Sequence, residues 1–73
     1  MSDFHYSMII QWSDEDHKFI VTIPEFSGCA THGNTYEEAV ENGKEAIEVC
    51  VEAEQALGRP LPQPHTYPHP YAA

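Results

Sequence analysis

The sequence predicts a small α+β domain in which three antiparallel β-strands form a meander and one long α-helix packs against it. Three observations predict this β-β-β-α order. A helix start signal at Thr35 precedes a long segment with helical apolar spacing. Residues 4–12 and 18–23 alternate apolar and polar side chains, as strands do. The chain has 73 residues, which allows one domain with a small core.

The predicted helix covers residues 36–57. Thr35 and Glu38 form a capping box, in which the Thr35 hydroxyl accepts from a free backbone N–H and Glu38 reaches back to the cap residue. Gly58 suits the left-handed turn that ends a helix, and Pro60 prevents its continuation. The apolar residues at helical spacing are Ala39, Val40, Gly43, Ala46, Ile47, Cys50, Ala53 and Leu57.

The first two strands are predicted over residues 4–12 and 18–23. The polar residues 13–17 between them suit a hairpin loop, and so short a loop permits only antiparallel pairing. The side chains expected on the buried face are Tyr6, Met8, Ile10 and Trp12 from the first strand and Phe19, Val21 and Ile23 from the second.

A third, shorter strand is predicted over residues 29–33. Pro24 lacks an N–H and ends the second strand, after which a bend returns Phe26 to the core. Strands that follow one another usually pair, so the sheet is a meander with the third strand at an edge. The helix is expected to cover its apolar face.

Residues 1–64 are predicted to form the domain, and residues 65–73 to form a flexible tail. Five prolines lie between residues 60 and 70, a density that favours extended polyproline-type backbone. Leu61 is expected to pack back onto the end of the helix. The tail beyond it has few apolar residues to anchor it.

Charge limits the classes of partner. Twelve Asp and Glu residues against three Lys and Arg give a formal net charge of −9, which argues against direct contact with nucleic acid or an anionic membrane. It favours a basic protein or a cation, although excess acid also serves solubility alone.

The sequence also gives an expected location. No apolar run approaches the ~20 residues needed to span a bilayer, and no signal sequence is recognised. We expect a cytoplasmic protein in which Cys29 and Cys50 are reduced and act as small buried apolar residues.

Five glutamates make the exposed face of the predicted helix acidic. They are Glu37, Glu41, Glu45, Glu48 and Glu52, with Lys44 as the compensating charge. Like charges four residues apart each destabilise a helix by roughly 0.2–0.5 kcal/mol. These glutamates are therefore a candidate surface for a basic partner, and an ordinary solvated helix face is the alternative.

The sequence predicts no catalytic, cofactor or metal site. The acids at 14–16 are contiguous, whereas a calcium loop spaces its ligands over about twelve residues. His65 and His69 have a zinc-like spacing but no accompanying cysteine pair, so metal handling by the tail is a distant third hypothesis. Cys29 and His32 would point to opposite faces of a strand. We expect a protein that is not an enzyme.

Three segments together resemble the HicB antitoxin family. Residues 6–23 are similar to its opening strand and hairpin. Residues 19–35 carry an aliphatic strand, Pro-Glu-Phe-Ser-Gly-Cys and Gly-Asn-Thr, and residues 37–47 carry Glu-Glu-Ala-x-x-Asn-x-x-Glu-Ala-Ile. Residues 58–64 resemble the Pro-x-Pro segment that follows. The resemblance implies a partial ribonuclease-H-like fold without that enzyme's active site.

The resemblance also implies a function. A HicB-like protein is the antitoxin of a type II toxin–antitoxin pair, and it binds and blocks a small basic HicA-type ribonuclease that cleaves messenger RNA. Many family members continue into a DNA-binding domain, but only sixteen proline-rich residues follow Leu57 here, so such a domain is not expected. The alternative is an orphan self-associating interaction domain with no toxin. A homodimer or higher oligomer fits both.

Overall fold

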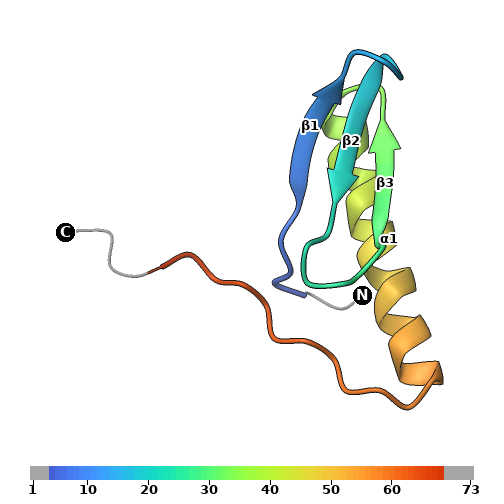
Figure 1. The fold of residues 1–73 in the computed structure, drawn as a ribbon, viewed down its shortest axis with the longest axis vertical. Helices are drawn as coiled ribbons and strands as arrows, with labels where there is room; N and C mark the ends of the chain where they lie inside the picture. The colour runs from blue at the N-terminus through green and yellow to red at the C-terminus, as the bar shows by residue number, and fades with distance from the viewer. Residues whose placement is uncertain (1–3, 69–73) are drawn as a thin grey trace.

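The computed structural model, which describes residues 4–68, has the predicted two-layer α+β fold (Figure 1). Strands β1 (Ile9–Ser13), β2 (Lys18–Thr22) and β3 (Ala30–Gly33) precede helix α1 (Tyr36–Ala56). The sheet order is β1-β2-β3. Helix α1 covers one face of the sheet and extends past the end of the strands (Figure 1).

Both strand pairs are antiparallel, so the predicted meander is confirmed. Ile10 is opposite Val21, and Val21 is opposite Thr31. The loop between β1 and β2 is closed by a hydrogen bond from the His17 amide to the Ser13 carbonyl, 2.8 Å, and His17 adopts a positive φ of 53°. The predicted hairpin therefore forms where the polar residues 13–17 place it.

Strand β1 begins later than predicted, at Ile9 instead of residue 4. The reason is that the backbone just before β1 forms hydrogen bonds with a side chain. The Ser7 amide donates to the carboxylate of Glu25, with both oxygens at 3.1 Å, and not to a neighbouring strand. Phe4, Tyr6 and Met8 nevertheless pack against the core.

The core lies between the sheet and α1. Val21 and Ile23 have no exposed surface, and they meet Ala39, Ile47 and Val51 from the helix. Burying an aliphatic side chain of this size stabilises the fold by about 1.5–3 kcal/mol. Phe26 joins this cluster from the bend, as predicted.

Trp12 is an exception among the side chains predicted to be buried, since half of its surface is exposed. It lies opposite Phe19, which in turn lies opposite Gly33, at the hairpin end of the sheet. Helix α1 starts at Tyr36, close to this end, and so it covers the sheet from that level onward. The wrong expectation came from reading strand alternation alone, because alternation does not say how far the covering helix reaches.

Gly33 allows the close approach of β3 and α1, and Gly43 packs closely against the Met8 side chain. A Cβ at Gly33 would lie 2.5 Å from the backbone nitrogen of Ala39, so only glycine permits β3 to lie this near the helix start. A Cβ at Gly43 would meet the Met8 sulfur at 2.6 Å. The layers are therefore held together with little space between them.

The ends of α1 are capped nearly as predicted. The Glu38 amide donates to the Thr35 hydroxyl at 3.0 Å, while the Glu38 carboxylate accepts from the Asn34 amide, one residue before the cap residue that was expected. At the other end Gly58 has φ 72° and its amide donates to Gln55. The Arg59 amide donates to Glu54, which completes a Schellman motif.

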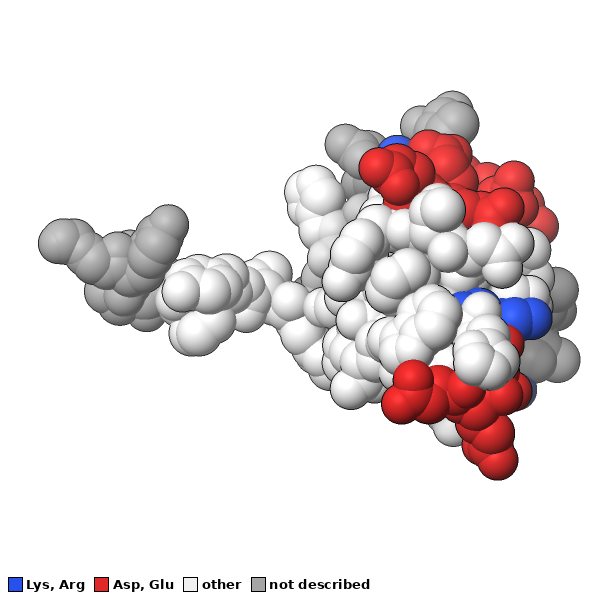
Figure 2. Space-filling model, turned by 90° about the horizontal axis from the view of Figure 1, so that it is seen from above, with Lys and Arg blue, Asp and Glu red and all other residues white. Residues whose placement is uncertain are grey.

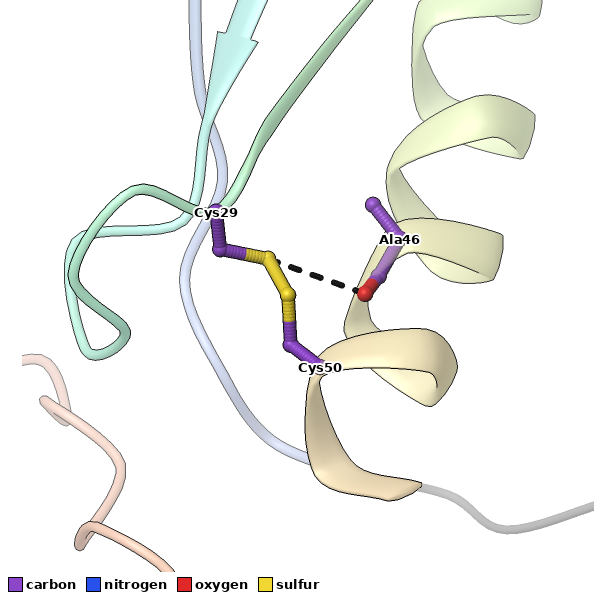
Figure 3. The surroundings of a disulfide bond; sticks show 3 residues. All are labelled: Cys29, Ala46 and Cys50. Carbon is purple, nitrogen blue, oxygen red and sulfur yellow. Dashed lines mark hydrogen bonds between the residues drawn. A yellow bond between two sulfur atoms is a disulfide. The ribbon is translucent and has the colours of Figure 1, made fainter. Parts of the chain in front are cut away.

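Cys29 and Cys50 form a disulfide bond, so the expectation of reduced thiols is wrong for this structure (Figure 3). Their Cα atoms are 6.6 Å apart, within the range that a disulfide spans. The Cys29 sulfur also lies 3.6 Å from the Ala46 carbonyl oxygen (Figure 3). The pairing was missed because the two residues are far apart in the chain, and only packing of the helix against the start of β3 brings them together.

The first residues of the proline-rich segment, Leu61 and Pro62, contact the domain. Leu61 packs against the core cluster, which confirms its predicted position. The Tyr6 hydroxyl donates to the Pro62 carbonyl at 2.8 Å. The chain after the helix is thereby attached to the segment that precedes β1.

Reduction of the disulfide should lower the free energy of unfolding by about 3 kcal/mol, because the bond closes a loop and so restricts the unfolded chain. Urea unfolding with and without a thiol reductant measures the loss. The Cys29→Ala, Cys50→Ala double variant is the control, since reductant should not change its stability. Mass measurement after alkylation of the native protein would contradict the bond if both cysteines were modified.

Candidate protein-binding surface

The five predicted glutamates share one side of α1. Glu37, Glu41, Glu45 and Glu52 are exposed and Glu48 is half-buried, whereas the buried residues of the helix are Ala39, Gly43, Ile47 and Val51. Steps of three and four residues keep side chains on one face of a helix. We call these five residues the acidic stripe.

The acidic stripe has little internal compensation. The Lys44 ammonium lies 3.8 Å from the Glu41 carboxylate, and both side chains are mostly exposed. Such a surface pair contributes about 0–1 kcal/mol. Arg59 pairs with Glu54, outside the stripe, at 3.5 Å. Most of the stripe's charge therefore remains available to a partner.

A shallow hollow lies on each side of the acidic stripe. One, of about 340 Å³, lies beside the disulfide between β3 and α1, and includes Thr31, Asn42, Glu45 and Val49. The other, of about 330 Å³, is formed by Tyr36, Glu37, Val40 and Glu41. Val49 and Tyr36 are each more than 60% exposed. The glutamates are thus bordered by apolar contact surface, as in protein-binding sites.

A second acidic group lies at the hairpin tip. Asp14, Glu15 and Asp16 are all exposed. Figure 2 looks onto this end of the molecule and shows the acidic side chains in two groups, with a band of mostly uncharged surface between them that holds basic atoms on one side. The molecule therefore presents acid on both sides of that band.

The two edges of the sheet differ. At β3 the Asn42 side-chain amide donates to the His32 carbonyl at 2.7 Å, which occupies part of the edge that was predicted to be open. The Ile23 amide donates to the Cys29 carbonyl, so the backbone polar groups of every second residue of β2, counted back from Ile23, face β3. The residues between them, Thr22 and Ile20, face β1 and pair there with Ile9 and Gln11, whose backbone polar groups therefore point toward β2. The backbone groups of Ile10 then point outward along β1. Its edge is the less protected of the two.

Glu25 joins three segments that are distant in the sequence. Its carboxylate accepts from the Ser7 hydroxyl at 2.9 Å and from the His65 amide at 2.8 Å, as well as from the Ser7 amide. Burial by itself would raise the pKa of Glu25, but the hydrogen bonds from His65 and Ser7 outweigh it and lower that pKa. The carboxylate therefore holds the proline-rich segment as far as His65 against the domain.

Protonation of Glu25 should release the segment around His65. Because the pKa of Glu25 is lower in the folded state, the stability that it contributes is present above the ordinary Glu pKa of about 4.3 and is lost as the pH falls through the folded value. NMR of the Ser7 and His65 amides should show both titrating together at acid pH.

A Glu25→Gln variant should abolish that shared titration and speed hydrogen exchange at His65, whereas Glu15→Gln at the hairpin tip should change neither. A His65 amide that does not respond to acid would contradict the tether.

Other kinds of site receive no support from the described residues. Within residues 4–68 no three His, Cys, Asp or Glu side chains are grouped so that they could hold a metal ion. His69, which was considered together with His65, lies outside the described residues. The Cys29 sulfur is bonded to Cys50 and is no free thiolate. In the part of the chain that the structure describes, α1 is too polar to cross a membrane.

Sequence reasoning identified the acidic stripe but missed Glu25 and the exposed rings of Trp12 and Tyr36. The signal for Glu25 was slight, since a single carboxylate beside Pro24 in a bend resembles any surface residue. Trp12 was assigned to the core by alternation, and Tyr36 was counted only as the first residue of the helix. Their exposure depends on where the two layers end.

The structure is a small acidic α+β domain with a largely uncompensated acidic stripe on α1. A family model for the HicB-like antitoxin of bacterial toxin–antitoxin systems matches residues 6–69, and the chain belongs to this family. Membership indicates an antitoxin, and thus a regulatory protein whose partner is a toxin.

Three curated relatives support the family. A UPF0150 protein of Thermoplasma acidophilum is 38% identical over 58 residues, which cover 80% of this chain and 83% of that protein. One from Synechocystis is 32% identical over 60 residues, covering 82% and 75%. One from Archaeoglobus fulgidus is 34% identical over 50 residues, covering 68% and 71%. No solved structure matches the chain significantly.

Proposed function

We propose that this protein neutralises a small basic ribonuclease of the HicA type by binding it through the acidic stripe and covering its active site. The observation that carries the proposal is the stripe itself, five glutamates on the free side of α1 in a chain of net charge −9. The β-β-β-α order supports the partial ribonuclease-H-like fold that the family resemblance implies. The protein would act without catalysis, by blocking a partner that cleaves messenger RNA.

The physical basis is electrostatic complementarity. A ribonuclease needs Lys and Arg to hold phosphates, so the surface around its active site is basic. An acidic surface accelerates encounter with that site and selects it over neutral surfaces. The apolar hollows beside the stripe supply contact area that charge alone does not provide.

Reversal of the stripe should abolish neutralisation. The Glu41→Lys, Glu45→Lys, Glu48→Lys variant replaces attraction by repulsion and should weaken binding to the toxin by about a hundredfold or more. Calorimetry with the basic protein captured by this chain from its native lysate measures the loss, and circular dichroism checks that the fold is kept.

The triple Gln variant at the same three positions is the control, and it should lose less affinity because it removes charge without reversing it. Undiminished binding by the Lys variant would remove the stripe from the proposed interface.

Self-association is a second candidate function, and the open edge of β1 favours it. Ile9–Ser13 contains no charged residue and no proline, the usual devices that protect an edge. Two copies could therefore pair their β1 strands across a two-fold axis without bringing their acidic stripes together. Pairing would also bury apolar surface that this small core leaves exposed, such as Ile9.

If β1 pairs with β1 of a second copy, the Ile9→Glu, Gln11→Glu variant should be monomeric, because a two-fold axis places the new charges close to each other. The Ala30→Glu, His32→Glu variant adds charge to β3 and should keep the oligomeric state. Sedimentation equilibrium of the isolated chain tests this. A monomeric unmodified chain, or equal effects of the two variants, would contradict pairing through β1.

A further inference from the structure

Three aromatic rings form a continuous row at the hairpin end of the domain. Trp12 from β1 meets Phe19 from β2 edge-on at a centroid distance of 5.1 Å, and Phe19 meets Tyr36 at the start of α1 at 4.3 Å. We call Trp12, Phe19 and Tyr36 the aromatic row. It crosses from the free edge of β1 to the first turn of the helix.

The row is exposed at both ends. Trp12 is 50% and Tyr36 63% exposed, while Phe19 between them is half-buried. Gly33 follows Phe19 across the sheet and has no side chain to extend the core at this level. The rings therefore pack on one another and present flat surface to solvent. Exposed aromatic surface of this kind is enriched in protein-binding sites.

Carboxylates border the row on both sides. Tyr36 shares the 330 Å³ hollow with Val40 and with Glu37 and Glu41 of the acidic stripe. On the other side the Trp12 indole N–H donates to the Asp14 carboxylate at 2.8 Å. In Figure 2 the surface between the two acidic groups is mostly uncharged, with basic atoms on one side of it. Lys18 lies on the opposite face of the sheet, because it precedes Phe19 in β2 and successive side chains of a strand point to opposite faces.

The combination of rings and carboxylates selects for arginine. A guanidinium group stacks on an aromatic face and at the same time forms paired hydrogen bonds to a carboxylate. A lysine ammonium is more strongly hydrated and lacks the planar group, so it gains less from such a site. A second copy of this chain does not suit the site, because it would bring its own carboxylates against those at 14–16, Glu37 and Glu41.

We propose that the aromatic row is the anchor site for an arginine side chain of the basic partner, with Tyr36 as the stacking ring and Glu37 as the paired carboxylate. This proposal rests on the proposed function, in that the partner is the basic toxin, and it adds the residues that select the partner. The acidic stripe then provides attraction over a distance, and the aromatic row provides recognition at contact.

Two probes test the site. Trp12 is the single tryptophan of the chain, so its fluorescence reports on the row. The unmodified chain is titrated with an oligo-arginine peptide and with an oligo-lysine peptide of equal length, and then with the captured toxin. The variants are Tyr36→Ala, Tyr36→Phe, which keeps the ring, and Leu57→Ala, which removes an equally exposed side chain at the far end of α1.

The expected result is a saturable change in Trp12 emission with tighter binding of oligo-arginine. Tyr36→Ala should weaken oligo-arginine binding by about two- to fivefold and remove the preference over oligo-lysine. Tyr36→Phe and Leu57→Ala should bind as the unmodified chain does. The same order of variants is expected with the toxin.

Equal affinity for the two peptides, or equal losses in Tyr36→Ala and Leu57→Ala, would overturn the arginine site. Titration with the toxin distinguishes failure of the arginine site from failure of the proposed function. Toxin binding that is lost on reversal of the stripe but unaffected by Tyr36→Ala leaves the antitoxin role intact and removes the anchor. Selective oligo-arginine binding without any toxin binding supports the site and removes the HicA-type partner.

Discussion

The structure depends on the packing of one helix against one face of a three-stranded sheet. A meander of this size cannot bury its apolar face alone, and an isolated helix of this length is marginal in water. Each element therefore requires the other. Gly33 makes the contact possible, since a Cβ there would collide with the backbone at the start of α1. The resulting core around Val21, Ile23 and Ile47 is small but fully enclosed.

This one-sided packing determines which surface of α1 stays exposed. Because the sheet occupies the apolar side of α1, the glutamates of the acidic stripe are left free on the other side. Because the helix begins level with the hairpin end of the sheet, Trp12 and Tyr36 are not covered. The acidic stripe and the exposed rings are therefore neighbours, because the helix starts near the hairpin end of the sheet. Family membership implies a toxin partner, and this exposed surface is the one that we propose for the contact.

Long-range attachments complete a domain whose core is near the lower limit of size. The disulfide ties the start of β3 to the middle of α1. Glu25 ties the bend after β2 to Ser7 and His65, and Tyr6 bonds to Pro62. None of these partners is near in the chain. Each attachment depends on the layers being in place, which is why the residues gave no signal by spacing or composition.

The sequence by itself determined the local features of this protein. Thr35, Glu38 and Gly58 defined the helix, alternation and a short polar loop defined the first hairpin, and the step of three and four residues placed the glutamates on one side. These are properties of neighbouring residues, and they hold in any fold that contains the segments. Tertiary structure decided the disulfide, the Glu25 junction and the exposure of Trp12, because each depends on distances between segments that the chain brings together only on folding.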